Sequence, residues 1–226
     1  MSAAAGDTPP SPFAELVYFE GRGRAEQARW VLAAAQEPFV NVSLQNAAQF
    51  QAVVSERCLF RQVPLLVMDG VNTVQSQAII RHVARRANLL GATAAEQALA
   101  DQVAEGCSDW RSAVLSLPFS GDTDACAAAV QRYAPVFEAL LKKSPTGWVA
   151  GGEALTYADV LVAEALTSYM EALGDFSAQV PYLATHRSLV LELPGLAGYL
   201  ASPQRFPFPT GDVGKAYVAN VRKCMT

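Results

Sequence analysis

The chain has 226 residues, of which 51% are apolar and 17% are charged, and its formal net charge is −4. It contains no run of about 18 apolar residues, so we expect no transmembrane helix, and it lacks the long basic runs of proteins that bind nucleic acid or anionic membranes. Four scattered cysteines without a CxxC pair, and only two histidines, disfavour a disulfide framework or a zinc site and are typical of a cytoplasmic protein.

The first part of the chain predicts an α/β domain. Residues 1–13 lack the basic start and apolar segment of a secretory signal, so we expect a flexible tail there. Residues 14–89 then alternate between short strands and helices. We expect strands over 15–19, 39–42, 65–68 and 72–75, and helices over 25–35, 47–56 and 77–86. This order is βαβ followed by ββα.

The second part, residues 94–226, predicts an all-helical domain, because strand signals end and long alanine-rich periodic segments begin. We expect helices over 94–117 and 124–143, a break over 118–121, a helix from Thr156, shorter helices to residue 200 and a last helix over 213–223. Thr156 and Asp159 form a capping-box pattern, and we interpret both as structural. Loss of Asp159 as a cap would then cost about 0.5–2 kcal/mol.

Tyr18 stands where the first strand passes into the first helix, in a loop that also carries Arg22 and Arg24. Packing is the commoner role for a tyrosine at a strand end. However, a phenol beside cationic groups and a helix N-terminus can also stabilise an anion.

Two further positions combine a structural role with a possible ligand contact. Pro64 can begin a strand, and a cis bond before it would turn the backbone of Val63 outward, towards a peptide-like ligand. A plain turn is an equally good interpretation. Ser76 precedes the helix expected at residue 77, where it can act as N-cap or receive a ligand carboxylate.

In their order and spacing these motifs resemble the cytosolic glutathione transferases, and the alpha class in particular. The matching segments are residues 18–24, 32–35, 62–64, 74–75, 88–89 and 156–159. Residues 75–78 are also similar to the sigma class. The resemblance covers nearly the whole chain. It implies a thioredoxin-like domain followed by a helical domain, with glutathione as co-substrate and no metal or tightly bound cofactor.

The resemblance also implies site residues. Tyr18 would hold the glutathione sulfur as a thiolate with Arg24 beside it, and this pair would be catalytic. The other implied glutathione contacts are Gln62, Val63, Gln75, Ser76 and, across the interface of a homodimer, Asp109 and Arg132. Phe60 matches an aromatic plug that enters the neighbouring subunit. The implied pocket for a hydrophobic electrophile or organic peroxide is lined by Phe19, Gly21, Leu115, Phe119 and Phe208.

The chain departs from the family at two places. Val53 stands where a basic residue binds the glycyl carboxylate, with Arg57 or Arg61 as substitutes, and Gln77 replaces an interface arginine. A detoxifying transferase is the function we expect. Two alternatives remain open: a glutathione-dependent isomerase of the prostaglandin D or ketosteroid type, and a ligandin-like carrier on the same fold without catalysis.

Overall fold

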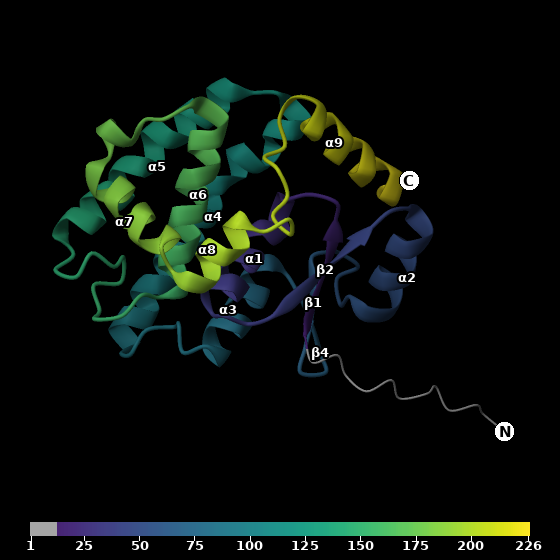
Figure 1. Cartoon of the computed structure of the whole chain (residues 1–226), viewed down its shortest axis with the longest axis horizontal. Coiled ribbons are helices and arrows are strands. Elements are labelled where there is room, and N and C mark those ends of the chain that lie inside the picture. The colour runs from purple at the N-terminus through teal and green to yellow at the C-terminus, as the bar shows by residue number, and fades with distance from the viewer. Residues whose placement is uncertain (1–12) are drawn as a thin grey trace.

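The computed structural model describes residues 13–226, and the predicted tail over 1–13 lies outside them apart from Phe13. A small α/β part and a larger helical part lie side by side (Figure 1). The α/β part contains β1 (Ala14–Phe19), a 3-10 turn (Gly23–Ala25), α1 (Glu26–Ala34), β2 (Phe39–Leu44), α2 (Ala47–Arg57), β3 (Leu65–Met68), β4 (Val71–Val74) and α3 (Ser76–Arg86).

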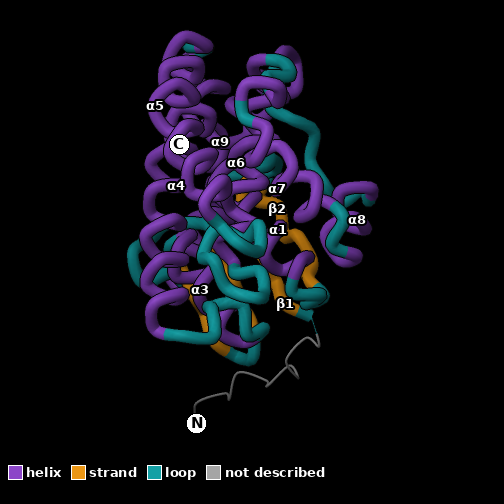
Figure 2. The backbone as a smooth tube through the Cα atoms, turned by 90° about the vertical axis from the view of Figure 1, so that its left-hand side faces the viewer, coloured by secondary structure: helices purple, strands orange, loops and turns teal. Residues whose placement is uncertain are grey.

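The four strands form one sheet in the order β2-β1-β3-β4, with β2 parallel to β1 and β3 antiparallel to it. The peptide between Val63 and Pro64, just before β3, is cis. Helices α1 and α3 pack together between the sheet and the helical part, and α2 lies on the opposite side against α9. Seen from the helical side, the strands lie behind α1 and α3 (Figure 2). This is the thioredoxin-like arrangement, so the predicted fold class is confirmed.

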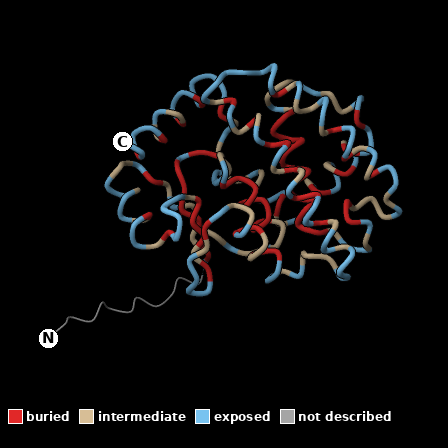
Figure 3. Tube along the Cα trace, turned by 180° about the vertical axis from the view of Figure 1, so that it is seen from behind, coloured by how far each residue is buried: buried red, intermediate tan, exposed pale blue. Residues whose placement is uncertain are grey.

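The helical part is built around α6 (Tyr157–Leu173), which is buried without interruption from Tyr157 to Tyr169. The surrounding helices are α4 (Ala94–Ser120), α5 (Thr123–Lys143), α7 (Pro181–Leu191) and α8 (Pro194–Ala201), with a short 3-10 turn at Ser177–Gln179. The last helix, α9 (Gly211–Met225), crosses back over the α/β part (Figure 1). Buried stretches gather inside both parts while outer helix turns are exposed (Figure 3).

Two predicted helix boundaries were wrong. The structure continues α4 through Pro118 to Ser120, where Gly121 ends it in the left-handed conformation and donates its N–H to the Leu117 carbonyl at 2.8 Å. A proline removes one intrahelical hydrogen bond, and here the glycine three residues later, not the proline, ends the helix. Ser76 is the first residue of α3, and Gln75 holds the N-cap position.

Asp159 does more than cap α6. Its fully buried carboxylate accepts a hydrogen bond from the Thr156 N–H at 2.6 Å, as the capping box predicts, and another from the Thr156 hydroxyl at 3.0 Å. It also accepts from the Val149 N–H at 2.7 Å and lies 2.9 Å from Nε2 of His186 on α7. One carboxylate therefore joins the start of α6, the preceding loop and α7.

Within residues 13–226, no helix combines the length and the apolar character that crossing a bilayer requires.

Candidate active site

Tyr18 is the last residue but one of β1, with its side chain buried and its hydroxyl in a polar cluster. The hydroxyl oxygen accepts a hydrogen bond from the Arg24 N–H at 3.1 Å and lies 3.4 Å from the hydroxyl of Tyr217 on α9. Because the Arg24 N–H donates to this oxygen, the Tyr18 proton is left to be donated elsewhere. Burial, and then the neighbouring Tyr18 hydroxyl, raise the pKa of Tyr217 well above its usual value, so Tyr217 stays protonated.

The loop between β1 and α1 needs glycines because both tyrosines lie against its backbone. Gly23 has a φ of +40°, and a Cβ there would lie 2.6 Å from the Tyr18 hydroxyl and 2.3 Å from that of Tyr217. At Gly21 a Cβ would lie 2.4 Å from the Tyr217 ring. A larger residue at either position would displace a tyrosine.

Three arginines hold this loop in place. Arg22 forms a two-pronged ion pair with Glu171 on α6, at 2.5 and 3.1 Å, and donates to the Phe206 carbonyl at 2.7 Å. Arg29 donates to the Arg22 carbonyl at 3.2 Å, and Arg111 donates to the Gly23 carbonyl at 3.0 Å. The backbone that surrounds the Tyr18 hydroxyl is therefore fixed from both parts of the molecule.

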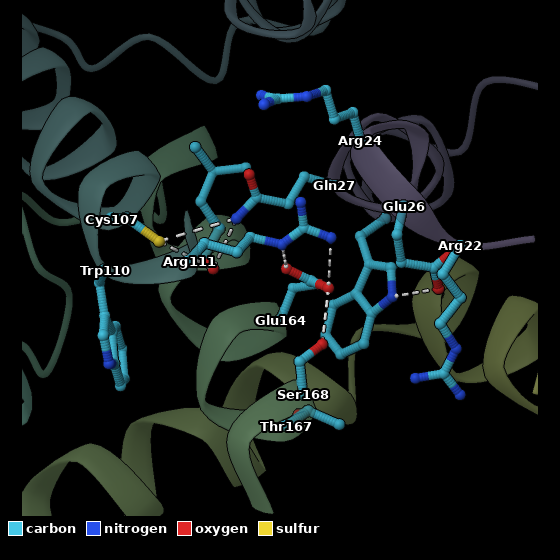
Figure 4. A network of polar contacts seen from close by, with 12 residues as sticks. Arg22, Arg24, Glu26, Gln27, Cys107, Trp110, Arg111, Glu164, Thr167 and Ser168 are labelled. Atoms are coloured by element: carbon cyan, nitrogen blue, oxygen red, sulfur yellow. Dashed lines mark hydrogen bonds and ion pairs between the residues drawn. The ribbon is translucent and has the colours of Figure 1, made fainter. Parts of the chain in front are cut away.

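Arg24 is the exception among the arginines of this region. Its side chain is exposed and extends away from the buried polar network (Figure 4). Across residues 13–226, no ion pair or side-chain hydrogen bond occupies its guanidinium group. Arg24 therefore presents a solvated cation at the rim of a hollow that Tyr18 also lines.

A hollow of about 540 Å³ opens beside Tyr18, between α4 and α9. Phe19, Leu115 and Phe119, three of the predicted pocket residues, form its apolar wall together with Val221. Phe208 does not reach this hollow: it lines a small neighbouring cavity, with the Arg22 guanidinium 5.4 Å from its ring. Gly21 lies beneath the Tyr217 ring.

Helix α4 also brings a row of serines to the hollow, beside Leu115 and Phe119, which the sequence analysis missed. The row consists, at every fourth position, of Ser108, Ser112, Ser116 and Ser120. The last three donate their protons to backbone carbonyls of their own helix, at 2.7, 3.0 and 3.2 Å. Their oxygens can therefore still accept hydrogen bonds from a ligand in the hollow.

Helix α9 closes the hollow and is fastened to the ends of two strands. Asn220 accepts a hydrogen bond from the Glu20 N–H and donates one to the Leu44 carbonyl, both at 2.9 Å. The Cys224 thiol lies 3.4 Å from the same carbonyl. On a neighbouring face of the helix, Tyr217 and Val221 line the hollow.

The remaining predicted glutathione contacts fall into two groups. Gln62 and Val63 lie in the loop before β3, and Gln75 and Ser76 begin α3. The Gln75 amide donates to the Gln62 side chain at 3.2 Å, and Gln75 has a φ of +71°, which is rare outside glycine. Asp109 and Arg132 are exposed on α4 and α5.

The candidates for the glycyl carboxylate differ in their surroundings. Arg57 lies 3.7 Å from Glu15, at the end of β1 opposite to Tyr18, so it is already paired there. Arg61 is exposed in the loop before β3, two residues from Val63. Val53 lies on α2 and is half-buried.

The described residues support neither a metal site nor a cysteine nucleophile. Among residues 13–226, no group of three or more His, Cys, Asp or Glu side chains could hold a metal ion. Burial raises the pKa of the Cys107 thiol to about 12, so this cysteine is not a nucleophile at neutral pH.

Comparison with known proteins gives a consistent result along the chain. Residues 14–85 match the family model "Glutathione S-transferase, N-terminal domain", and residues 108–203 match "Glutathione S-transferase, C-terminal domain". Glutathione S-transferase 3 of Gallus gallus is 33% identical over 93% of this chain and 93% of its own length. Glutathione S-transferase alpha-4 of Rattus norvegicus is 32% identical over 87% of this chain and 92% of its own.

Solved structures agree. The glutathione S-transferase of Ascaris lumbricoides superposes with a TM-score of 0.73 at 26% identity, covering 84% of this chain and 97% of that one. A hookworm protein described as a monomeric glutathione S-transferase, from Necator americanus, also has a TM-score of 0.73, at 25% identity, over 83% of this chain and 96% of its own.

Proposed function

Since this chain belongs to the glutathione S-transferase family, and so is a transferase with glutathione as co-substrate, we propose that Tyr18 holds the glutathione sulfur as a thiolate. The observation that carries this proposal is the Tyr18 hydroxyl, which accepts from the Arg24 N–H at 3.1 Å and borders a hollow of about 540 Å³. Within residues 13–226 the hydroxyl proton has no backbone acceptor and only the Tyr217 hydroxyl, at 3.4 Å, beside it, so it can be donated to the sulfur.

One hydrogen bond has the right magnitude for this task. A free thiol has a pKa of roughly 8.5, so only a few per cent is ionised at neutral pH. Lowering that pKa by about two units requires about 2.7 kcal/mol, and a hydrogen bond to a charged group contributes about 1.5–3 kcal/mol. Tyr18 therefore supplies most of the change, and the solvated Arg24 guanidinium adds a favourable field.

The rest of glutathione would be held by residues of the loop before β3 and the start of α3. The γ-glutamyl carboxylate would take the N–H groups at the start of α3, beside Gln75 and Ser76, with Gln62 next to them. The backbone of Val63 would pair with the cysteinyl unit. For the glycyl carboxylate we favour Arg61 over Arg57, because Arg57 is already paired with Glu15.

The thiolate then attacks an electrophile held in the hollow. On an aromatic chloride a carbon–sulfur bond forms and chloride leaves, and on an organic peroxide the sulfur takes the terminal oxygen as the alcohol departs. Conjugation of glutathione with an aromatic chloride is the direct test of the proposal and excludes a carrier. Product analysis with prostaglandin H or an unsaturated ketosteroid tests the isomerase alternative.

We also infer a cytoplasmic location, because the cysteines within residues 13–226 are buried and form no disulfide.

The row of serines leads to a prediction about the electrophile. Because the hollow combines apolar side chains with a row of hydroxyl oxygens, we expect a preference for electrophiles that carry a hydrogen-bond donor. Two chloronitrobenzamides that differ only in an N-hydroxyethyl or an N-propyl group make the comparison. In a Ser112→Ala, Ser116→Ala double variant the ratio of their kcat/KM values should fall by about three- to tenfold, as for one or two neutral hydrogen bonds.

Alanine favours helices, so the double variant should fold well. Ser188→Ala is the matched control, because Ser188 is an exposed helical serine that donates to a carbonyl of its own helix at 3.1 Å, on α7. An unchanged ratio in the double variant would show that the serines do not contact the electrophile.

A homodimer is the second part of the proposal. Leu59 and Phe60 project from the loop before β3 with 83% and 58% of their surface exposed, unusual for large apolar side chains. Asp109 and Arg132 are exposed on α4 and α5, where they would act at a partner's glutathione site. Because the similar hookworm structure is described as monomeric, the oligomeric state needs a direct measurement.

Phe60→Ala should weaken the dimer markedly. Truncating a phenylalanine in a well-packed site costs about 3–5 kcal/mol, so the variant should dissociate at concentrations where the wild type stays dimeric. Light scattering across a dilution series measures this, with Tyr182→Ala, an exposed aromatic on α7, as control. A wild-type mass near the chain's 24.1 kDa at micromolar concentration would contradict the dimer.

A further inference from the structure

One peptide unit connects Tyr18 to the interior of the helical part. The carbonyl of Gly23 accepts a hydrogen bond from Nη2 of Arg111 at 3.0 Å. The N–H of the same peptide, which belongs to Arg24, donates to the Tyr18 hydroxyl at 3.1 Å. The two ends of a peptide group are rigidly coupled by its planarity. The hydrogen bond on the carbonyl therefore sets the direction of the N–H that meets Tyr18.

Arg111 is itself fixed by a second buried residue. Glu164 on α6 accepts two hydrogen bonds from Arg111, at 2.6 and 3.1 Å, and a third from the Ser168 hydroxyl at 2.9 Å. Arg111 is 5% exposed and Glu164 1%. Because the two parallel hydrogen bonds of a buried arginine–carboxylate pair must both be made, they fix the orientation of the Arg111 guanidinium group. Figure 4 shows the pair at the centre of the network, with Arg24 extending away from it.

The pair affects Tyr18 by two physical routes. The Arg24 N–H lies against the tyrosine oxygen only while the peptide keeps its orientation, and that contact directs the hydroxyl proton outward. A donor on the carbonyl also polarises the peptide, which strengthens its N–H as a donor. Both routes make Tyr18 a better donor to a thiolate. Arg111 itself is enclosed by protein, so it acts through the peptide.

We propose that Arg111, held by Glu164, is a positioning residue for the sulfur site. From α4 it orients the peptide between Gly23 and Arg24, and through that peptide it sets the hydrogen bonding of Tyr18. This inference rests on the proposed role of Tyr18. It adds that the helical part, which supplies the electrophile pocket, also tunes the glutathione thiol bound on the α/β part.

The test replaces both members of the pair, Arg111→Met with Glu164→Gln, so that no buried charge is left unpaired. The thiolate absorbance of bound glutathione, titrated against pH, gives the thiol pKa. We expect that pKa to rise by roughly half to one unit, as for one neutral hydrogen bond. At a pH below the wild-type thiol pKa, kcat/KM should fall by about three- to tenfold, with the Kd for glutathione changed less than about twofold.

The matched control is Arg22→Met with Glu171→Gln. This pair also joins the loop to α6 through two hydrogen bonds, yet it does not touch the peptide that meets Tyr18. The control should shift the thiol pKa by less than the Arg111 variant does, because Arg22 holds the loop without orienting that peptide. If the Arg111 variant titrates like wild type, or if both variants shift the pKa equally, the inference is overturned.

A more conservative variant guards against loss of folding. Arg111→Lys keeps the positive charge beside Glu164 but lacks the fork that reaches Glu164 and Gly23 together. It should raise the thiol pKa as well, by a smaller amount, and an unchanged pKa would count against the inference.

Tyr18→Phe separates the proposed role of Tyr18 from the proposed role of Arg111. If it leaves the pKa unchanged, the proposed function fails; if it shifts the pKa while neither Arg111 variant does, only the positioning role fails.

Discussion

Replacing Tyr18 by phenylalanine is expected to raise the thiol pKa of bound glutathione by about one to two units while glutathione still binds. The substitution removes one hydroxyl and keeps the ring, which is buried at the end of β1. What is lost is a hydrogen bond to an anion. The γ-glutamyl and glycyl ends of glutathione would be held by other residues, so its affinity should fall little.

The thiolate's ultraviolet absorbance, titrated against pH in the complex, reports this pKa directly. Conjugation at neutral pH should fall about tenfold, because each unit of pKa removes a factor of ten in thiolate once the thiol is mostly protonated. Tyr217→Phe is an informative comparison, since Tyr217 has its hydroxyl 3.4 Å from that of Tyr18. If wild type and the Tyr18 variant titrate alike, Tyr18 only packs, and Arg24 or Tyr217 must activate the thiol.

Asp159→Ala is expected to cost about 3–5 kcal/mol of folding free energy, the range for breaking a buried polar pair. This exceeds the loss expected of a helix cap. The substitution leaves the Thr156 and Val149 N–H groups and the His186 ring buried without their acceptor. Each unsatisfied buried group adds about 1–3 kcal/mol before the structure relaxes.

Urea denaturation at one fixed protein concentration measures this loss, because the stability of a dimer depends on protomer concentration. Thr185→Ala on α7 is the control, since its exposed hydroxyl bonds only within its own helix. The folded Asp159 variant should bind glutathione as the wild type does. A loss of only about 0.5–2 kcal/mol would mean that Asp159 is a cap and its other contacts are weak.

These two residues show how far the sequence could be interpreted. The α/β order and the long helices follow from local periodicity, and the fold class was confirmed. Tyr18 and Arg24 are six residues apart and their contact lies within one loop, so local sequence sufficed to pair them as candidates. The catalytic role of Tyr18 remains a prediction that the thiolate titration of Tyr18→Phe tests.

What sequence alone could not give are contacts between distant segments. Tyr217 meets Tyr18 across 199 positions, and Arg111 meets Gly23 across 88. No local pattern marks such pairs, because each depends on how two domains pack. The same holds for Asp159. Its role as a helix cap could be predicted from the sequence, but its contact with His186, a residue of another helix, could not. The predicted break at Pro118 was wrong for a different reason. The local rule that proline interrupts a helix predicted it, but α4 continues through Pro118 to Ser120.

Two sets of side chains on helix α9 have different roles. Asn220 and Cys224 fasten it to the strand ends, whereas Tyr217 and Val221 line the hollow. Tyr217 also meets the Tyr18 hydroxyl and packs on Gly21 and Gly23, so an exchange there would disturb the sulfur site. Val221 makes none of these contacts, and neither anchoring side chain depends on it. A change of electrophile preference can therefore arise by single substitutions at position 221, through variants in which α9 still closes the pocket.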